Sequence, residues 1–378
     1  MKRTMKKMVS MALTGTMAVA VLAGAGTSEV KAADKAKIGV LVADVSGEEA
    51  QGFRSYYENY IAGNYDVEFN YTDALQSAED EKTAIEKFAS QGCQAIISFS
   101  SNDRVQQIET CEKYGVYYAV ASGVLDDAQY ETYKTYEYFA GQVGPGNDTE
   151  FEAGKDMGAY YKEQGVSKVA IYGAFIPNPM HVYRVAGVLN GLGCTYGGES
   201  DMNAIAGQIF QDQTVDLSKV EGDVEVVSYL QGYGDTTTDE LNAAIQKTPD
   251  AFISVGMATT FFAQSLSEAG ISFSDIDSFT ETNGNSMKNG TLTYLAGKYS
   301  SSIGPVFALV MNAINGNVIR DEDGNAPSIS QGYLVATDSD TFDKYSVSDS
   351  GDAPIYDKET LDSIISDNVT FEYVKTLV

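Results

Sequence analysis

The residues that could do chemistry are polar side chains that follow apolar runs, at the points where buried strands would end. A catalytic Ser-His-Asp group or a histidine-rich metal site has almost no material, because the chain contains one histidine and no tryptophan. That histidine, His181, is either a ligand contact or a helix-start residue. Carboxylates are plentiful, but no pair is marked out by its spacing. We therefore expect a binding protein without catalytic residues, cofactor or metal, and not an enzyme.

In the first half of the chain, the candidate ligand contacts follow three apolar runs. Hydroxyl, amide and carboxylate groups at these points could pair with hydroxyl groups of a ligand, because a buried hydroxyl group without a partner is costly. Helix capping is the alternative for Asp44 and for Ser101 and Asn102, since a helix is expected soon after each. The candidates in this half are Asp44, Ser46, Ser101, Asn102 and Ser122.

In the second half, the candidates again follow expected strands, and several lie in a loop with two prolines. Asn178 can donate and accept hydrogen bonds at once, as the edge of a sugar or a base requires. Tyr233 could stack on a ring and still bond through its hydroxyl group. Lys298 indicates an anionic or carbonyl group on the ligand, or else a salt bridge to Glu281 or Asp44. The candidates are Phe175, Asn178, His181, Gln231, Tyr233, Glu281 and Lys298.

Alternating strands and helices must position these residues. Continuous apolar runs separated by segments of helical periodicity are typical of a parallel sheet buried on both faces. In the first half, strands are expected at 38–42, 67–71, 95–99 and 117–121. After a glycine-rich stretch at 139–147, strands are expected at 168–172, 224–230, 251–255, 276–279 and 291–296. The pattern predicts two Rossmann-like α/β lobes, each a parallel sheet with helices on both faces.

The tail of the chain has a different composition. It is expected to form a strand at 332–336, then an acidic loop rich in serine and aspartate, and then a final helical stretch from Lys358. Three cysteines occur in regular elements, and we expect them to be small buried hydrophobic residues. A disulfide between Cys93 and Cys111 is the alternative.

Length and charge narrow the function classes. A chain of 378 residues exceeds one ordinary core, since single cores stop growing near roughly 250–300 residues. Lys and Arg number 25 against 53 Asp and Glu, which gives a net charge of −28. Such an acidic chain repels phosphate backbones, so neither DNA nor any other nucleic acid is expected as a partner.

The first 32 residues have the order of a secretory signal peptide. Four basic residues precede an apolar run, and Val30-Lys31-Ala32 offers small residues at the positions of a cleavage site. A membrane anchor is the alternative, although the run is short for a span. Ala25 stands where the cysteine of a lipoprotein would be, so no lipidation is expected there. The segment predicts an exported protein.

The serial order of these elements resembles the type I periplasmic (solute) binding proteins, most nearly the ribose-type sugar-binding branch. The resemblance covers about residues 36–335. It is carried by Lys37-Ile-Gly-Val-Leu-Val42, by Gln91-Gly-Cys-Gln-Ala-Ile-Ile-Ser98, by Arg184-Val-Ala-Gly187, and by Lys288-Asn-Gly-Thr-Leu-Thr-Tyr-Leu-Ala296 with the helix that follows it.

Two departures from this family stand out. The first strand lacks the usual aromatic pair just after it, and the first aromatic residue is Phe53. Ser122 and Gly123 stand where the family has an Asp-Arg pair. In this family Arg184 would be a structural residue.

The resemblance implies two lobes joined by three crossing segments, near 141–147, 298–303 and Gln331. The lobes would comprise 36–142 plus 299–330 and 143–298 plus 331–378.

The implied function is that of a monomeric, exported receptor that closes on a small molecule, most nearly a sugar. It would deliver this ligand to the permease of an ABC transporter. Two alternatives stay open. Lys298 and the loop at 176–180 are similar to the nucleoside-binding proteins of the basic membrane protein family. A receptor that only presents its ligand to a membrane sensor would have the same fold.

Overall fold

The computed structural model describes residues 35–349 and 353–377. The expected signal peptide, residues 1–32, lies outside this part of the chain. Among the described helices, none is long and apolar enough to cross a membrane.

The first lobe is built on a parallel sheet in the order β13-β5-β4-β3-β1-β2. Successive residues of its central strands point into different cores: Ile97 and Ala119 join one cluster of buried residues, and Ile96 and Val120 join the other. The sheet is therefore buried on both faces, as its continuous apolar runs predict. Its strands are β1 (Ala36–Leu41), β2 (Val67–Tyr71), β3 (Ala95–Ser98), β4 (Tyr117–Ala121), β5 (Phe139–Gly144) and β13 (Ser328–Ser330).

The second lobe has a sheet in the order β14-β12-β11-β10-β6-β9, in which only the edge strand β14 is antiparallel to its neighbour. The predicted class of two α/β lobes with parallel sheets is thus confirmed, with one antiparallel edge strand. The strands are β6 (Lys168–Tyr172), β9 (Glu225–Leu230), β10 (Ala251–Ser254), β11 (Ser272–Ser278), β12 (Leu292–Lys298) and β14 (Leu334–Ala336). A separate pair is formed by β7 (Thr195–Tyr196) and β8 (Val220–Glu221).

Two helices of the first lobe begin at side-chain caps. Ser77 accepts a hydrogen bond from the backbone N–H of Asp80, and Asp103 accepts one from that of Gln106. The helices of the first half are α1 (Glu48–Ser55), η1 (Tyr56–Ile61), α2 (Ala62–Asn64), α3 (Ala78–Ser90), α4 (Arg104–Tyr114) and α5 (Asp127–Tyr133). Later helices include α9 (Thr237–Gln246), α10 (Ala258–Ala269), η3 (Ser300–Ile303) and α12 (Gly304–Ile314).

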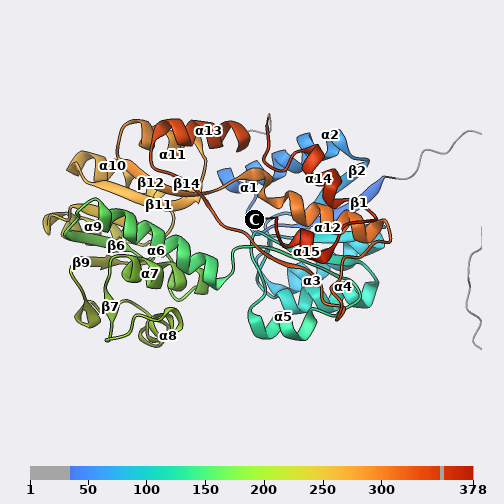
Figure 1. Cartoon of the computed structure of the whole chain (residues 1–378), viewed down its shortest axis with the longest axis horizontal. Helices are drawn as coiled ribbons and strands as arrows, with labels where there is room; N and C mark the ends of the chain where they lie inside the picture. The colour runs from blue at the N-terminus through green and yellow to red at the C-terminus, as the bar shows by residue number, and fades with distance from the viewer. Residues whose placement is uncertain (1–34, 350–352, 378) are drawn as a thin grey trace, which may run out of the picture. The chain divides into compact units, whose positions relative to one another are not determined.

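Helices α6 (Asn147–Glu163) and α7 (Pro179–Gly191) lie side by side in the second lobe with their backbones in contact (Figure 1). A Cβ atom on Gly154 would lie 2.0 Å from the carbonyl oxygen of Arg184. A Cβ atom on Gly187 would lie 2.0 Å from that of Phe151. Only glycine allows this approach, so we call the contact between α6 and α7 at these two residues the glycine seam.

Four α-helices differ from the sequence-based expectation. The acidic loop expected after β14 is wrong, because Ser339–Asp349 forms helix α13, which packs against α11. Its partner α11 (Glu281–Lys288) and the helices α8 (Met202–Asp212) and α5 were not expected either. These helices are short and bury few residues; α8 buries only Ile205, Ala206 and Ile209. Their apolar periodicity is correspondingly weak.

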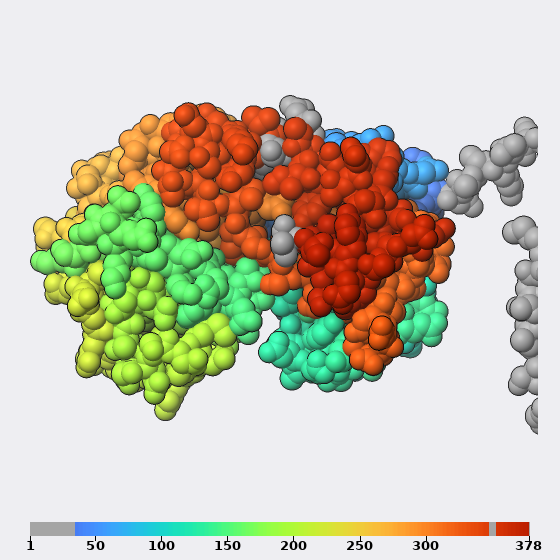
Figure 2. Space-filling model, viewed as in Figure 1, coloured from blue at the N-terminus to red at the C-terminus, as the bar shows by residue number. Residues whose placement is uncertain are grey.

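The described elements alternate between the two lobes at four places, one more than the three expected. The chain crosses after β5, after β12 and between β13 and β14. The tail was expected to lie wholly in the second lobe, but α14 (Lys358–Ile364) packs against α12 of the first lobe. There the side chain of Asn312 donates to the carbonyl oxygen of Ile364 over 2.6 Å. Figure 2 shows this red segment, with α15 (Phe371–Val374), on the lobe that carries the blue residues of the first strands.

Three of the crossing segments carry a tyrosine. Tyr299 lies after β12, Tyr333 lies between β13 and β14, and Tyr356 lies between α13 and α14. The rings of Tyr299 and Tyr356 are buried and parallel, with centroids 6.4 Å apart. Tyr299 and Tyr356 thus join two crossing segments by packing.

The cysteines are buried and unpaired. Cys93, Cys111 and Cys194 are all free thiols, so the alternative of a disulfide between Cys93 and Cys111 is wrong. Burial raises the pKa of each thiol, which keeps it protonated.

Candidate functional site

A cleft of about 1110 Å³ lies where strands of both sheets end. Residues of both lobes line it, and Figure 2 shows a hollow between the cyan residues of α5 and the green residues of the second lobe. Predicted residues that line the cleft are Asp44, Ser101, Asn102, Ser122, Asn178 and Lys298.

Aromatic faces contribute to the wall of the first lobe. Phe53 of α1 and Phe99 after β3 both line the cleft, and their rings stack with centroids 5.3 Å apart. The sequence lacks an aromatic pair directly after the first strand, but the helix and the neighbouring strand supply one together. The wall therefore offers an apolar surface beside hydroxyl and amide groups, which suits a ring with polar edges.

Asp44 and Ser46 form a turn before α1. The Asp44 carboxylate accepts hydrogen bonds from the backbone N–H groups of Ser46 and Gly47, each over 2.9 Å, and one from the Ser46 hydroxyl. The bond from the Ser46 backbone lowers the pKa of Asp44. Asp44 thus stabilises the turn ahead of α1 and does not cap the helix, whose N-cap is Gly47 without a side-chain bond, while it also lines the cleft. Ser46 is not part of the lining.

Five predicted residues of the second lobe lie outside the cleft lining: Phe175, His181, Gln231, Tyr233 and Glu281. His181 is buried and its Nδ1 accepts from the backbone N–H of Phe175 over 3.2 Å. Phe175 itself is exposed. The Gln231 side chain donates to a backbone carbonyl group, and Tyr233 stacks on Phe261 with centroids 4.1 Å apart. Both follow β9, which is the edge strand farthest from β14 in the sheet.

Asn178 begins helix α7. Its Oδ1 accepts from the backbone N–H of Met180 over 3.0 Å, so the side-chain oxygen caps the helix. The cap fixes the amide group at the cleft wall, and the structure shows no further partner for its Nδ2 within the described residues. That Nδ2 group is a donor that a ligand oxygen could accept from.

The loop after β3 is held by a carboxylate that the sequence analysis did not single out. Glu81 of α3 is fully buried. It accepts hydrogen bonds from the Ser100 hydroxyl, from the backbone N–H groups of Asn102 and Asp103, and from the Asn102 side chain. Burial alone would raise the pKa of Glu81, but these donors hold it below its ordinary value. Glu81 therefore positions Ser101 and Asn102 at the cleft.

Lys298 joins the two lobes. Its Nζ lies 3.6 Å from Glu49 Oε1 of α1 and donates to the Ser122 hydroxyl over 3.3 Å. Ser278 at the end of β11 donates to the other Glu49 oxygen over 2.9 Å. Lys298 does form a salt bridge, but with Glu49. The sequence had suggested Glu281 or Asp44 as the partner. Glu281 and Lys298 both line a smaller pocket of about 190 Å³.

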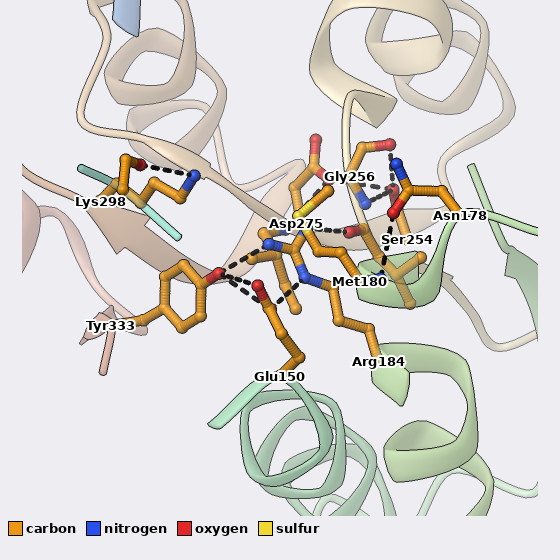
Figure 3. Close-up of polar contacts among 12 residues, drawn as sticks. Glu150, Asn178, Met180, Arg184, Ser254, Gly256, Asp275, Lys298 and Tyr333 are labelled. Atoms are coloured by element: carbon orange, nitrogen blue, oxygen red, sulfur yellow. Dashed lines mark hydrogen bonds and ion pairs between the residues drawn. The ribbon is translucent and has the colours of Figure 1, made fainter. Parts of the chain in front are cut away.

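A buried network ties a crossing segment to the second lobe (Figure 3). Glu150 of α6 accepts from Arg184 Nε over 2.6 Å and from the Tyr333 hydroxyl. Arg184 also donates to the carbonyl oxygen of Val255 over 2.8 Å and to the Tyr333 oxygen. Arg184 is buried, and these contacts give it the structural role that the resemblance implies.

Two carboxylates on β11 have raised pKa values. Asp275 is fully buried, and burial followed by the charge of Asp277 raises its pKa well above the ordinary range. It accepts from the Ser254 hydroxyl over 2.9 Å and from the backbone N–H of Thr259; Figure 3 shows it beside Ser254. Burial raises the pKa of Asp277 to about 6. The charges of Glu49 and Lys298 also act on this carboxylate.

His181 and Asp277 should give opposite pH dependences of stability. Burial, with the charge of Arg184, lowers the pKa of His181 from 6.5 to about 4, so the folded state binds fewer protons and stability rises with pH between these values. The pKa of Asp277 is raised from 3.8 to about 6, so its contribution falls over nearly the same range. Asp277→Asn should therefore make the urea midpoint rise more steeply between about pH 4 and 6.

Urea unfolding of the unmodified chain and of two variants tests this. His181→Gln, the control, should change the slope in the opposite direction. Equal slopes for all three proteins would contradict the assignment of either titration.

Comparisons with known proteins identify the fold. No protein-family model matches the chain, and no curated protein matches it in sequence. Solved structures do match. A solute-binding protein of an ABC transporter from Actinobacillus succinogenes, with bound D-allose, superposes with a TM-score of 0.60 at 17% identity. The match covers 82% of this chain and all (100%) of that one. This is the fold of the type I periplasmic binding proteins.

Other structures with this binding-protein fold give the same result. The binding component of the arabinose ABC transporter from a Shewanella species, solved with L-arabinofuranose, has a TM-score of 0.58 at 16% identity, and the match covers 82% of this chain and 94% of that one. The myo-inositol binding protein of Caulobacter has a TM-score of 0.58 at 14% identity, with 82% and 95% covered. At these identities the similarity establishes the fold.

Proposed function

We propose that this chain is an exported solute-binding protein that captures a sugar between its two lobes and delivers it to the permease of an ABC transporter. The observation that carries the proposal is the cleft itself. It lies at the ends of both sheets and combines stacked aromatic rings with hydroxyl, amide and carboxylate groups. A sugar has the same combination, an apolar ring face with polar edges, so each side of the ligand would find a partner.

The solved structures with this fold support the choice of ligand class. Those described above were solved with D-allose, L-arabinofuranose and myo-inositol. The net charge of −28 disfavours nucleic acid as a partner, and the proposal assigns no catalytic residue, cofactor or metal. The protein would act as a monomer, because one chain contains both walls of the cleft.

Closure of the two lobes would hold the ligand. Glu49, Lys298, Ser122 and Ser278 already make polar contacts from one lobe to the other beside the cleft. A ligand that contacts both walls adds to these contacts only in the closed arrangement. Such a ligand shifts the equilibrium between open and closed forms by its difference in affinity for them.

A binding screen tests the function. The ligand-free protein would be titrated with monosaccharides, oligosaccharides, nucleosides and amino acids while its thermal unfolding is followed. A sugar at 100 times its dissociation constant should stabilise the protein by roughly 2.7 kcal/mol, which raises Tm by a few degrees. A shift with nucleosides alone would support the nucleoside-binding alternative, and a screen without any sugar response would overturn the proposal.

Asn178→Asp should separate ligand binding from helix capping. Aspartate keeps the oxygen that accepts from Met180 N, so the cap and the Tm of the ligand-free protein should stay nearly unchanged. The variant loses the Nδ2 donor, and affinity for the sugar should fall by roughly tenfold, as for one lost hydrogen bond. Isothermal titration calorimetry measures the affinity. An affinity equal to that of the unmodified protein would remove Asn178 from the binding site.

A further inference from the structure

One arginine in the cleft wall has fewer hydrogen-bond partners than two other arginines of the described chain. Arg104 is the first residue of α4 and lines the cleft. Its only hydrogen bond within the described residues runs from Nη1 to the carbonyl oxygen of Val124. By contrast, Arg184 donates to a carboxylate, a hydroxyl and a carbonyl group, and Arg320 donates to three carbonyl groups.

The unused edge of this guanidinium group is defined by Nε and Nη2. The Arg104 Nε is buried and has no hydrogen-bond partner among the described residues. No carboxylate there lies within 4.0 Å of the group, since Arg104 forms none of the ion pairs. A guanidinium group has five N–H donors, and a donor that is removed from water without an acceptor destabilises the protein. This arrangement is unfavourable unless another group completes it.

Gly123 keeps this arrangement possible. A Cβ atom at this position would lie 2.8 Å from Arg104 Nη2. The side chain of Arg104 therefore occupies the space over residue 123 that any other amino acid would fill. Ser122, which precedes this glycine, lines the cleft and bonds to Lys298. Gly123 lines the cleft too, so Nη2, which lies over it, is beside other polar groups of the cleft wall.

We propose that Arg104 is a specificity-determining residue whose Nε–Nη2 edge donates hydrogen bonds to two neighbouring oxygens of the bound sugar. A planar guanidinium group can give two parallel bonds to such a pair of oxygens, which a lysine cannot. The inference rests on the proposed function and adds to it a chemical requirement, an adjacent pair of ligand oxygens.

The charges around the cleft favour a neutral ligand. Asp126, Asp127 and Asp148 line the same cleft, and the chain as a whole is strongly acidic. Glu81 acts on Arg104 electrostatically, so the charge of the arginine is already partly balanced. These acidic groups would repel a carboxylate on the ligand, whereas they would not repel uncharged hydroxyl groups. The oxygen pair is therefore assigned to two adjacent hydroxyl groups of a neutral sugar.

Substitutions at Arg104 and a matched control test the inference. The probes are D-allose, L-arabinose, myo-inositol and D-glucuronate, each titrated by calorimetry into the unmodified chain and into Arg104→Lys and Arg104→Gln. Both variants should weaken binding of the neutral probe that the unmodified chain prefers by tenfold or more. The Tm of the ligand-free variants should stay nearly unchanged, because the loss of the single hydrogen bond is offset by removal of the buried, unpartnered Nε. Arg320→Lys, which alters an arginine outside the cleft lining, should keep the affinity within about twofold.

Gly123→Ala provides a second, independent variant. Its Cβ atom should displace the guanidinium group without a backbone clash, since a flexible side-chain end is the nearest neighbour. It should weaken binding in the unmodified chain but have no effect when combined with Arg104→Gln. Additive effects of the two substitutions would contradict the mechanism.

The outcomes distinguish the inference from the function on which it rests. If the unmodified chain binds a neutral probe and the Arg104 variants bind it within about twofold, the inference is overturned and the proposed function stands. A lower Tm with unchanged affinity would show a structural role instead. Tighter binding of glucuronate than of the neutral probes would overturn the assignment of a neutral ligand. If no probe binds and the wider sugar screen is also negative, both proposals fail.

Discussion

Replacing Arg184 by methionine should lower the free energy of unfolding by roughly 3–5 kcal/mol, the usual effect of removing one partner of a buried ion pair. Methionine has a similar length and suits a helix. The variant leaves the Glu150 carboxylate buried with the Tyr333 hydroxyl as its remaining side-chain donor among the described residues. It also leaves the carbonyl oxygen of Val255 without the Nη1 donor. The large effect comes from the uncompensated charge more than from the lost attraction.

Urea unfolding measures this change, and two further variants test the cause. Adding Glu150→Gln to Arg184→Met removes the stranded charge, so the double variant should recover part of the lost stability. Arg54→Met is the control: Arg54 pairs with Glu58 over 2.9 Å in an exposed i,i+4 pair, and its loss should cost at most about 1 kcal/mol. Equal losses of unfolding free energy at Arg184 and Arg54 would show that the buried network stabilises the protein no more than an exposed ion pair does.

Replacing Gly154 by alanine should destabilise the second lobe by roughly 3 kcal/mol, the upper range for overpacking. The new Cβ atom would lie 2.0 Å from the carbonyl oxygen of Arg184. Backbone atoms cannot move aside as a side chain can, so the glycine seam would have to open. The shift would also pull Arg184 away from Glu150, because the two residues belong to the two helices of the seam.

The matched control for Gly154 is Gly207, which also lies inside a helix, α8. Nothing lies within 4 Å of a Cβ atom built on Gly207. Gly207→Ala should therefore raise stability by about 0.4–1 kcal/mol through reduced freedom of the unfolded chain. Opposite signs of the two changes in thermal unfolding are the expected result. Stabilisation by both substitutions would contradict the close approach of α6 and α7.

Strands buried on both faces were the easiest elements to predict from the sequence. The strands at Tyr117–Ala121 and Lys168–Tyr172 have the bounds expected for them, because continuous apolar runs have sharp ends. The edge strand Val67–Tyr71 also has its expected bounds, although only Val67 is buried there. Helix α13 was missed because Phe342 is the one buried residue among its described side chains, 339–347, and packs its ring against Phe279 of the second lobe. Such a helix depends on tertiary contacts that its own sequence pattern does not show.

The site was predictable only as far as strand ends determine it. The rule that ligands bind beyond the carboxyl ends of strands placed Asp44, Ser122 and Lys298 at the cleft. It could not show that β9 is an edge strand, which places Tyr233 outside the lining. It also could not find Arg104, whose guanidinium group reaches the wall from a helix. The packing of Arg104 over Gly123 depends on two segments that are distant in the sequence, and neither segment's own sequence predicts it.

The tyrosines of the crossing segments have a practical consequence for spectroscopy. The chain contains no tryptophan, so ultraviolet emission comes from tyrosine without the usual stronger background. Tyr299, Tyr333 and Tyr356 all lie where the chain passes from one lobe to the other. Any rotation of the lobes changes the surroundings of these rings, and the parallel pair of Tyr299 and Tyr356 would change its overlap. Opening and closing could therefore be timed optically in the unlabelled protein.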